Sequence, residues 1–223
     1  MAAVKRRAAF FDLDKTLVSV NTGTLYVRWR VREGHMGLRE LARASFWSLQ
    51  YTLGILDAER MSTEAVRTLT GVPEDRFIGE CSSWVESEVL RHVAPKARAE
   101  LDRKRDEGYL CALLTSSSPY VAEPVAAHVG VEHVLCSRLE VREGSFTGAL
   151  AGRLCYGAGK VEKALQWAER HGVDLAESAF YTDSISDLPM LERVGEPRVI
   201  NPDPRLSRLA RRRGWATETW RTS

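Results

Sequence analysis

The chain has 223 residues, which is enough for one sizeable hydrophobic core or for a core with a small accessory domain. Its content of 44% hydrophobic and 28% charged residues excludes the disordered and fibrous classes. The 32 basic and 30 acidic side chains leave a formal charge of +2, which provides no overall field for binding nucleic acid.

Local patterns exclude two further classes. No run approaches the roughly 18 apolar residues of a membrane span, and the basic N-terminal segment reaches Asp12 without the long apolar stretch of a secretory signal. The four cysteines include no C-x-x-C pair, which indicates reduced thiols rather than disulfides or a zinc site. We therefore expect a cytoplasmic protein.

Short apolar runs that end in polar residues predict buried strands of a parallel sheet. These runs lie at 8–14, 109–118, 178–184 and 196–201. Helical stretches, each closing on a glycine of the kind favoured at helix C-caps, lie at 94–108, 118–130, 159–172 and 203–214. Because strands and helices alternate, the sequence predicts an α/β fold, a Rossmann-like three-layer core around a mostly parallel sheet.

Two segments break this alternation. Residues 139–150 alternate around Gly144 and predict a β-hairpin beside the sheet. Residues 20–92 carry mainly helical signals, which we interpret as a helical insertion. Within them, 26–32 alternates apolar and basic residues as a strand would, but its helical neighbours favour a helix.

The insertion is rich in apolar and aromatic side chains. Four aromatic residues could line a substrate pocket, but packing between the insertion helices is the commoner role for such side chains. The aromatic residues are Phe46, Trp47, Tyr51 and Trp84, and the apolar residues at helical spacing are Leu38, Leu41, Ala42, Phe46, Leu49 and Leu53.

Five arginines crowd the segment 205–213 near the C-terminal end. Basic residues suit the last turn of a helix, and no aromatic residues interleave with these. The pattern therefore favours the solvated face of a last helix over a nucleic-acid contact.

Polar side chains follow three of the predicted strands. Asp12 and Asp14 end the first, residues 116–118 ("SSS") end the second, and Asp183 and Asp187 follow the third. Because ligands of open α/β sheets bind beyond the carboxyl ends of the strands, we expect these groups to converge. Four carboxylates in one crevice would repel one another unless a cation lay among them, and an oxygen-rich site suits Mg²⁺.

Each feature also has an ordinary structural explanation. The D-x-D pair could be a solvated turn, and Asp183 could cap a helix that begins near Ser184. Lys160 after Gly159 suggests a phosphate-binding P-loop, but Val161 stands where that motif needs Ser or Thr. The joint occurrence of these features at strand ends favours a site.

Four short motifs occur in order along practically the whole chain: "DLDKT", "ALLTS", Lys160 and "DSISD". In this order and spacing the chain resembles the haloacid dehalogenase-like superfamily of phosphohydrolases. It is most similar to the branch, subfamily IB, that contains phosphoserine phosphatase. The resemblance implies a catalytic core formed by 1–19 and 93–223, with 20–92 as an α-helical cap inserted after the first motif.

The resemblance also implies a Mg²⁺-dependent phosphoric monoester hydrolase. Asp12 would attack phosphorus and form an aspartyl-phosphate, which divides one displacement into two easier steps. Asp14 would act as acid and base, and its backbone carbonyl would bind Mg²⁺. Asp12 would also be a Mg²⁺ ligand, Asp183 would bind the ion directly, and Asp187 would bind it through water or hold the coordination shell.

The remaining motif residues would bind phosphate or shape the site. The resemblance implies that Ser116 and the amide of Ser117 hold phosphoryl oxygens, while Lys160 offsets the charge of nucleophile and phosphate. Thr16 would orient the loop that follows Asp14. Ser186 stands where relatives often have Asn.

The substrate is the least determined part of the prediction. Phosphoserine phosphatases carry a Glu that meets the substrate ammonium, and this chain has Asn21 there, whose amide lacks that charge. Phosphoserine is thus retained but not favoured, and other small phosphorylated metabolites remain open, such as histidinol phosphate or a lipid or sugar phosphate. Arg28, Arg30 and Arg32 could meet a substrate carboxylate or a second phosphate, although exposed helical arginines are commoner.

Two alternatives come from other functional classes. A receiver-type signalling module also gathers acidic residues, a hydroxyl and a Lys around Mg²⁺, but its phosphorylated Asp lies on a middle strand. A degenerate relative that only binds its ligand would not need every motif kept. The oligomeric state stays open.

Overall fold

The structure is a computed structural model that describes residues 5–35, 37 and 58–220. Three of the aromatic residues considered for a pocket, Phe46, Trp47 and Tyr51, lie outside these residues, as do the apolar residues at helical spacing between 38 and 53.

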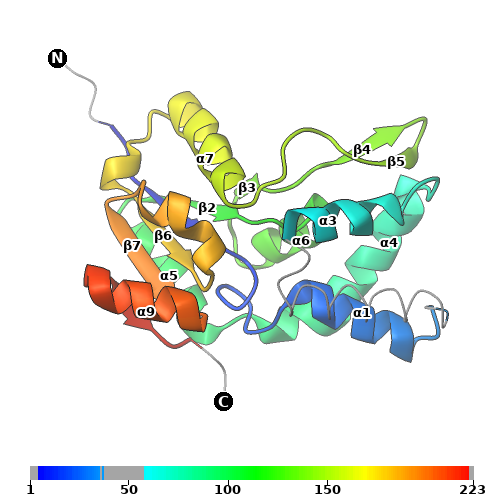
Figure 1. Ribbon diagram of the computed structural model, residues 1–223, viewed down its shortest axis with the longest axis horizontal. Helices are drawn as coiled ribbons and strands as arrows, with labels where there is room; N and C mark the ends of the chain where they lie inside the picture. Colours follow the sequence, from blue (N-terminus) through cyan, green and yellow to red (C-terminus); the bar gives the residue numbers. More distant parts are fainter. Residues whose placement is uncertain (1–4, 36, 38–57, 221–223) are drawn as a thin grey trace.

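A six-stranded parallel sheet forms the centre of the molecule, in the order β3-β2-β1-β6-β7-β8 (Figure 1). Its strands are β1 (Ala8–Phe11), β2 (Leu110–Leu114), β3 (His133–Leu135), β6 (Ala179–Thr182), β7 (Glu196–Ile200) and β8 (Ala216–Glu218). Each predicted strand contains an observed one. The edge strands β3 and β8, three residues each, were not predicted because such short pieces carry no pattern of their own.

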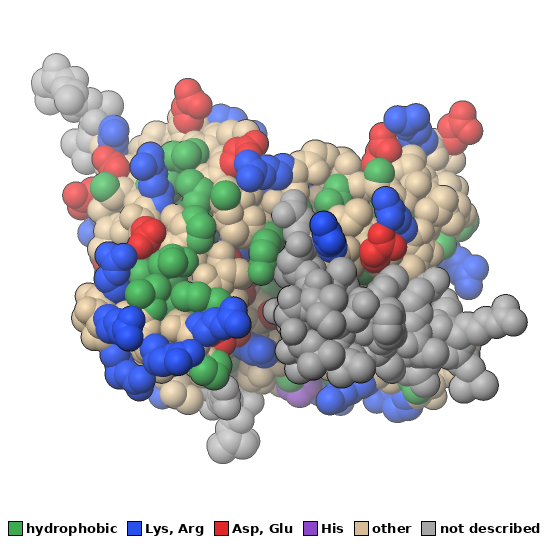
Figure 2. All heavy atoms as spheres, viewed as in Figure 1, with side chains coloured by type: hydrophobic (Ala, Val, Ile, Leu, Met, Phe, Trp, Pro, Cys, Tyr) green, Lys and Arg blue, Asp and Glu red, His purple; other side chains and the backbone are tan. Residues whose placement is uncertain are grey.

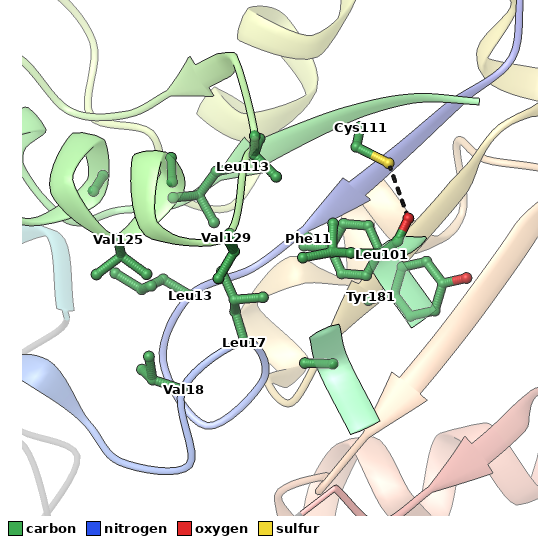
Figure 3. Close-up of a cluster of buried hydrophobic side chains, with 14 of the residues drawn as sticks. Phe11, Leu13, Leu17, Val18, Leu101, Cys111, Leu113, Val125, Val129 and Tyr181 are labelled. Carbon is green, nitrogen blue, oxygen red and sulfur yellow. Dashed lines mark hydrogen bonds between the residues drawn. The ribbon is translucent and has the colours of Figure 1, made fainter. Parts of the chain in front are cut away.

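Helices cover both faces of this sheet and give the predicted three layers. Alternate residues of β1 face opposite layers, as strand geometry requires. Phe11 packs with helices α5 and α6, and Phe10 with α7, α8 and α9. These helices are α5 (Pro95–Asp106), α6 (Pro119–His128), α7 (Ala158–His171), α8 (Leu188–Leu191) and α9 (Pro204–Arg213). Figure 3 shows the first of these clusters, with Phe11, Leu113 and Val125 in it.

The regular elements that the structure describes within residues 20–92 are all helical. They form α1 (Thr22–Arg32), α3 (Ala58–Arg67) and α4 (Glu74–Trp84), followed by a π-helical turn (Val85–Val89) and a 3₁₀ turn (Leu90–His92). The helix favoured for 26–32 is confirmed by α1. The strand-like alternation does not describe which side chains are buried. Tyr26 and Trp29 pack on the core cluster at helical spacing, while Val31 stays 40% exposed.

The hairpin of β4 (Leu139–Arg142) and β5 (Ser145–Leu150) forms a separate two-stranded sheet. Its position differs from the prediction, since it packs on the insertion rather than beside the main sheet (Figure 1). Phe146 stacks edge-on against Phe77 of α4 at 5.3 Å, and its backbone exchanges hydrogen bonds with Gly71 and Val72. The apolar partners that Phe146 needs lie there, which sequence spacing does not reveal.

The surface and the thiols agree with the sequence. The arginines of α9 are exposed, and Lys and Arg side chains gather over this helix in Figure 2, as expected for a solvated face. Cys81, Cys111, Cys136 and Cys155 are buried free thiols. Within the described ranges, every helix is too short or too polar to cross a bilayer.

Candidate active site

The carboxyl ends of three neighbouring strands place polar side chains together. Asp12 follows β1, Thr115 follows β2 and Asp183 follows β6, and these strands lie side by side in the sheet. All three residues are buried. Because β1 lies between β2 and β6, the crevice beyond Asp12 is the point where such folds bind ligands.

Lys160 joins two of the carboxylates. Its ammonium lies 2.7 Å from Asp12 Oδ1 and 2.7 Å from Asp187 Oδ2, distances typical of charge-assisted hydrogen bonds. The residue belongs to the first turn of α7, where the chain passes very close to Leu154. A Cβ on Gly159 would lie 2.0 Å from the Leu154 carbonyl oxygen, so only glycine permits this start of the helix.

The charge balance of this cluster is incomplete. Burial raises the pKa of Asp12 to about 8 although Lys160 opposes the shift, and burial raises the pKa of Asp183 to about 7 against Lys15, whose ammonium is 3.8 Å away. Burial alone would lower the pKa of Lys160, but Asp12 and Asp187 outweigh it, so the ammonium stays charged. Lys160 and Lys15 therefore do not fully offset the cost of ionising these buried carboxylates, and a further cation would favour their charged form.

Asp14 points toward the start of α1. Its Oδ1 accepts a hydrogen bond from the Thr22 amide at 2.8 Å, and the Asn21 amide group lies 3.3 Å from its Oδ2. Burial raises the pKa of Asp14, which the bond from Thr22 opposes. Asn21 also caps α1 by accepting from the Thr24 amide. The residue that we considered for substrate recognition is thus engaged with Asp14 and its own helix.

Thr115, which was not among the predicted site residues, is the first hydroxyl residue beyond β2. Thr115 directly follows the strand and is buried, whereas Ser116 and Ser117 come next and are half-buried. The Thr115 hydroxyl accepts from the Ser117 amide at 3.1 Å. Its position, the first residue beyond the apolar run, is the signal that would have identified it.

Two further polar residues were missed. Thr182 donates to Asp187 Oδ2 at 2.6 Å and so fixes the carboxylate that binds Lys160. Asn201, the first residue after β7, donates to the Lys15 carbonyl at 2.7 Å. The Thr16 hydroxyl, by contrast, has no hydrogen-bond partner among the described residues, so its loop-orienting role stays a prediction.

The arginines considered for substrate recognition are mostly engaged elsewhere. Arg32 pairs with Glu88 at 2.6 Å, and Arg30 lies 3.7 Å from Glu80. Arg28 is exposed on α1. Trp84 is buried against Tyr26, with ring centroids 5.0 Å apart, which is the packing role that the sequence favoured.

Residues 9–192 match the family model of haloacid dehalogenase-like hydrolases. The chain belongs to this family. A probable phosphatase of Mycobacterium tuberculosis is 32% identical over 215 residues, which cover 94% of this chain and 74% of the relative. A phosphoserine phosphatase of the same species is 31% identical, over 96% and 71%. A histidinol-phosphatase of Neisseria meningitidis is 25% identical, over 94% and 97%.

Solved structures of the haloacid dehalogenase-like fold superpose closely. A Bordetella pertussis protein of unknown function has a TM-score of 0.88 at 30% identity, covering 96% of this chain and 98% of that one. A phosphoserine phosphatase has a TM-score of 0.68 at 19% identity, over 92% and 91%, which shows the shared fold. These matches confirm the predicted family and fold, and the relatives' names agree with the predicted phosphoric monoester hydrolase.

Proposed function

We propose that the protein is a Mg²⁺-dependent phosphomonoesterase that acts on a small phosphorylated metabolite through an aspartyl-phosphate. The observation that carries this proposal is the buried bridge of Lys160 between Asp12, which follows β1, and Asp187, in the 3₁₀ turn after β6. It holds one oxygen of Asp12 and leaves the other for attack on phosphorus.

The residues would share the reaction as follows. The free oxygen of Asp12 forms a bond to phosphorus while the ester P–O bond breaks, and Asp14 donates its proton to the leaving alcohol oxygen. Water then attacks phosphorus, Asp14 takes its proton, and phosphate leaves with Asp12 restored. The raised pKa of Asp14 suits a group that must hold a proton before the first step.

The donor set at the strand ends fits a hard cation. Within the described residues, no three His, Cys, Asp or Glu side chains are gathered as metal ligands. Two carboxylates, those of Asp12 and Asp183, and the backbone carbonyl of Asp14 would hold a Mg²⁺ ion that keeps several waters. The ion would supply positive charge to the phosphoryl oxygens. Asp187, whose Oδ2 is held by Lys160 and Thr182, would orient Lys160 and would contribute to the metal site only through water or by holding the coordination shell.

The end of β2 would hold the phosphoryl group. Thr115 and Ser116 would donate hydroxyl protons to its oxygens, and Lys160 would offset its charge. The Ser117 amide, which we first assigned to phosphate, donates to Thr115 in this structure and so would orient that hydroxyl.

The division into a core of 1–19 and 93–223 and a cap of 20–92 is part of the proposal. The hairpin at 139–150 would move with the cap, because Phe146 packs on Phe77. A cap that closes over Asp12 would exclude water during transfer.

Several small phosphorylated metabolites remain candidate substrates. Relatives include a phosphoserine phosphatase and a histidinol-phosphatase, but Asn21 has no carboxylate for a substrate ammonium, and its amide donates to Asp14. Phosphoserine is retained without being favoured, beside histidinol phosphate and lipid or sugar phosphates. Family membership argues against the receiver-type alternative.

The test uses p-nitrophenyl phosphate with and without Mg²⁺. We expect turnover that EDTA abolishes and added Mg²⁺ restores, and we expect Asp12→Asn to lose at least about 1,000-fold in kcat, since it removes the nucleophile. An unchanged Tm would show that the variant is folded. Full activity in this variant would refute the mechanism. A separate screen of the wild-type enzyme against phosphate metabolites, ranked by kcat/KM, would identify the substrate.

A further inference from the structure

The side chain of Asn201 connects two distant parts of the backbone. Its Nδ2 donates to the Lys15 carbonyl at 2.7 Å, and its Oδ1 accepts from the Trp220 amide at 2.9 Å. Asn201 is only 5% exposed, so both bonds are protected from water. An amide side chain carries its donor and its acceptor on separate atoms, so it can donate to a carbonyl and accept from an N–H at the same time.

The peptide held by Asn201 lies in the loop that carries both proposed reacting carboxylates. Lys15 directly follows Asp14 and has φ of 54°, in the left-handed region that a residue with a Cβ adopts only when its surroundings enforce it. Its amide donates to the Val20 carbonyl at 3.0 Å, and Asn201 holds its carbonyl. The amide and the carbonyl of Lys15 are thus both hydrogen-bonded, which fixes the turn after Asp14.

A second set of contacts joins the same C-terminal segment to Phe11, the residue before Asp12. The Trp220 ring lies 5.6 Å from the Tyr181 ring, and Tyr181 stacks on Phe11 at 4.4 Å with the planes 1° apart. Figure 3 shows the rings of Phe11 and Tyr181 face to face. Phe11 immediately precedes Asp12. The segment that ends at Trp220 therefore supports the Asp12–Asp14 loop through a polar bridge and through an aromatic stack.

We propose that Asn201 is a positioning residue, which sets the geometry of the loop that carries Asp12 and Asp14 and is itself held by Trp220. This inference rests on the proposed function for its link to catalysis. Asn201 touches no reacting atom, so its contribution is to keep nucleophile and acid/base at their mutual spacing. Misplacement by about 1 Å at a phosphoryl-transfer site costs on the order of 100-fold in rate.

Two variants separate the two hydrogen bonds. Asn201→Asp keeps the acceptor for Trp220 but cannot donate to Lys15. Asn201→Gly loses both bonds while allowing the positive φ of 45° that position 201 has. We expect kcat with p-nitrophenyl phosphate to fall about tenfold or more in both, with KM within about twofold, the pattern of an interaction that serves only the transition state.

Ser178→Ala is the matched control. Ser178 is fully buried, accepts from the Ala8 amide at 2.9 Å and donates to the Asp174 carbonyl at 2.6 Å, so it too ties two backbone segments, but at the opposite end of the same sheet. We expect a similar loss of Tm with kcat unchanged. An equal loss of kcat in Ser178→Ala would mean that general destabilisation explains the effect and would overturn the proposal.

Hydrogen exchange measured by mass spectrometry tests the positioning independently of turnover. We expect Asn201→Gly to speed amide exchange in residues 12–20, and Ser178→Ala to leave it unchanged. Unchanged exchange in Asn201→Gly would overturn the positioning role whatever the reaction, and faster exchange with full kcat would overturn its link to catalysis. Absence of Mg²⁺-dependent turnover in the wild type would refute the proposed function instead, and the exchange result would still decide whether Asn201 holds the loop.

Discussion

At the scale of single residues, the two carboxylates that surround Lys160 make its buried position possible. Lys160 is a charged side chain in the first turn of a helix, where a cation is mildly disfavoured, and it is 2% exposed. Two carboxylates at 2.7 Å compensate for both costs. Removing one partner of such a buried cluster leaves uncompensated charge and is strongly destabilising.

Replacing Lys160 by Met tests this arrangement. Met keeps the unbranched shape of the side chain without the ammonium and leaves Asp12 and Asp187 to repel each other, so we expect a loss of about 3 kcal/mol in unfolding free energy. We also expect kcat/KM to fall at least about 100-fold, because the phosphoryl charge loses its partner. Urea unfolding and steady-state kinetics measure the two effects. Lys163→Met on the same helix is the control, and equal losses there would contradict the assignment.

At the scale of elements, the hairpin of β4 and β5 depends on a few aromatic contacts. Phe146 lies 5.3 Å from Phe77 and 5.5 Å from Tyr120, so one ring joins the hairpin, α4 and α6. Tyr120 in turn donates to Glu74 at 2.6 Å. The hairpin itself was predictable from Gly144, but its location was not, because the sequence does not indicate which residues an apolar side chain will pack against.

Phe146→Ala would remove the shared ring of this cluster. We expect a loss of about 3 kcal/mol in stability, the usual cost of a buried Phe-to-Ala cavity. Limited proteolysis should then cut 139–150 earlier than in the wild type, because the hairpin loses its buried aromatic contact with the insertion. Ser145→Ala, next to it, should behave as the wild type. Unaltered proteolysis of Phe146→Ala would show that the ring does not anchor the hairpin.

On the scale of the whole molecule, charged pairs stabilise the end of the sheet that lies opposite the candidate site. Glu196 begins β7 and accepts hydrogen bonds from Tyr109 at 2.7 Å and from the buried Lys104 at 3.0 Å. Burial alone would raise the pKa of Glu196, but these bonds and Arg198 lower it to about 2. The ionised form is therefore favoured in the folded state, and it contributes stability only while the carboxylate is charged.

The stability of the protein should depend on pH through this group. An unfolded Glu titrates near pH 4.3, so the contribution is complete above about pH 5 and is lost as pH falls toward 2. We expect Glu196→Gln to be about 1 kcal/mol less stable than the wild type at pH 7, after allowance for partial exposure, and the difference to shrink below about pH 4.5. Thermal unfolding across pH measures it. Glu192→Gln, which removes an exposed partner of Arg213, should change little, and a pH-independent gap for Glu196→Gln would contradict this assignment.

The sequence by itself determined the family, the alternation of strands and helices, and the candidate carboxylates Asp12, Asp14, Asp183 and Asp187. It could do so because apolar runs and strand-end polar residues are local patterns. The tertiary structure decided what depends on contacts distant in the chain. It engaged Asn21 with Asp14 and brought Asn201 to the Lys15 carbonyl. No local pattern records such hydrogen bonds, because each is made by residues that only folding brings together.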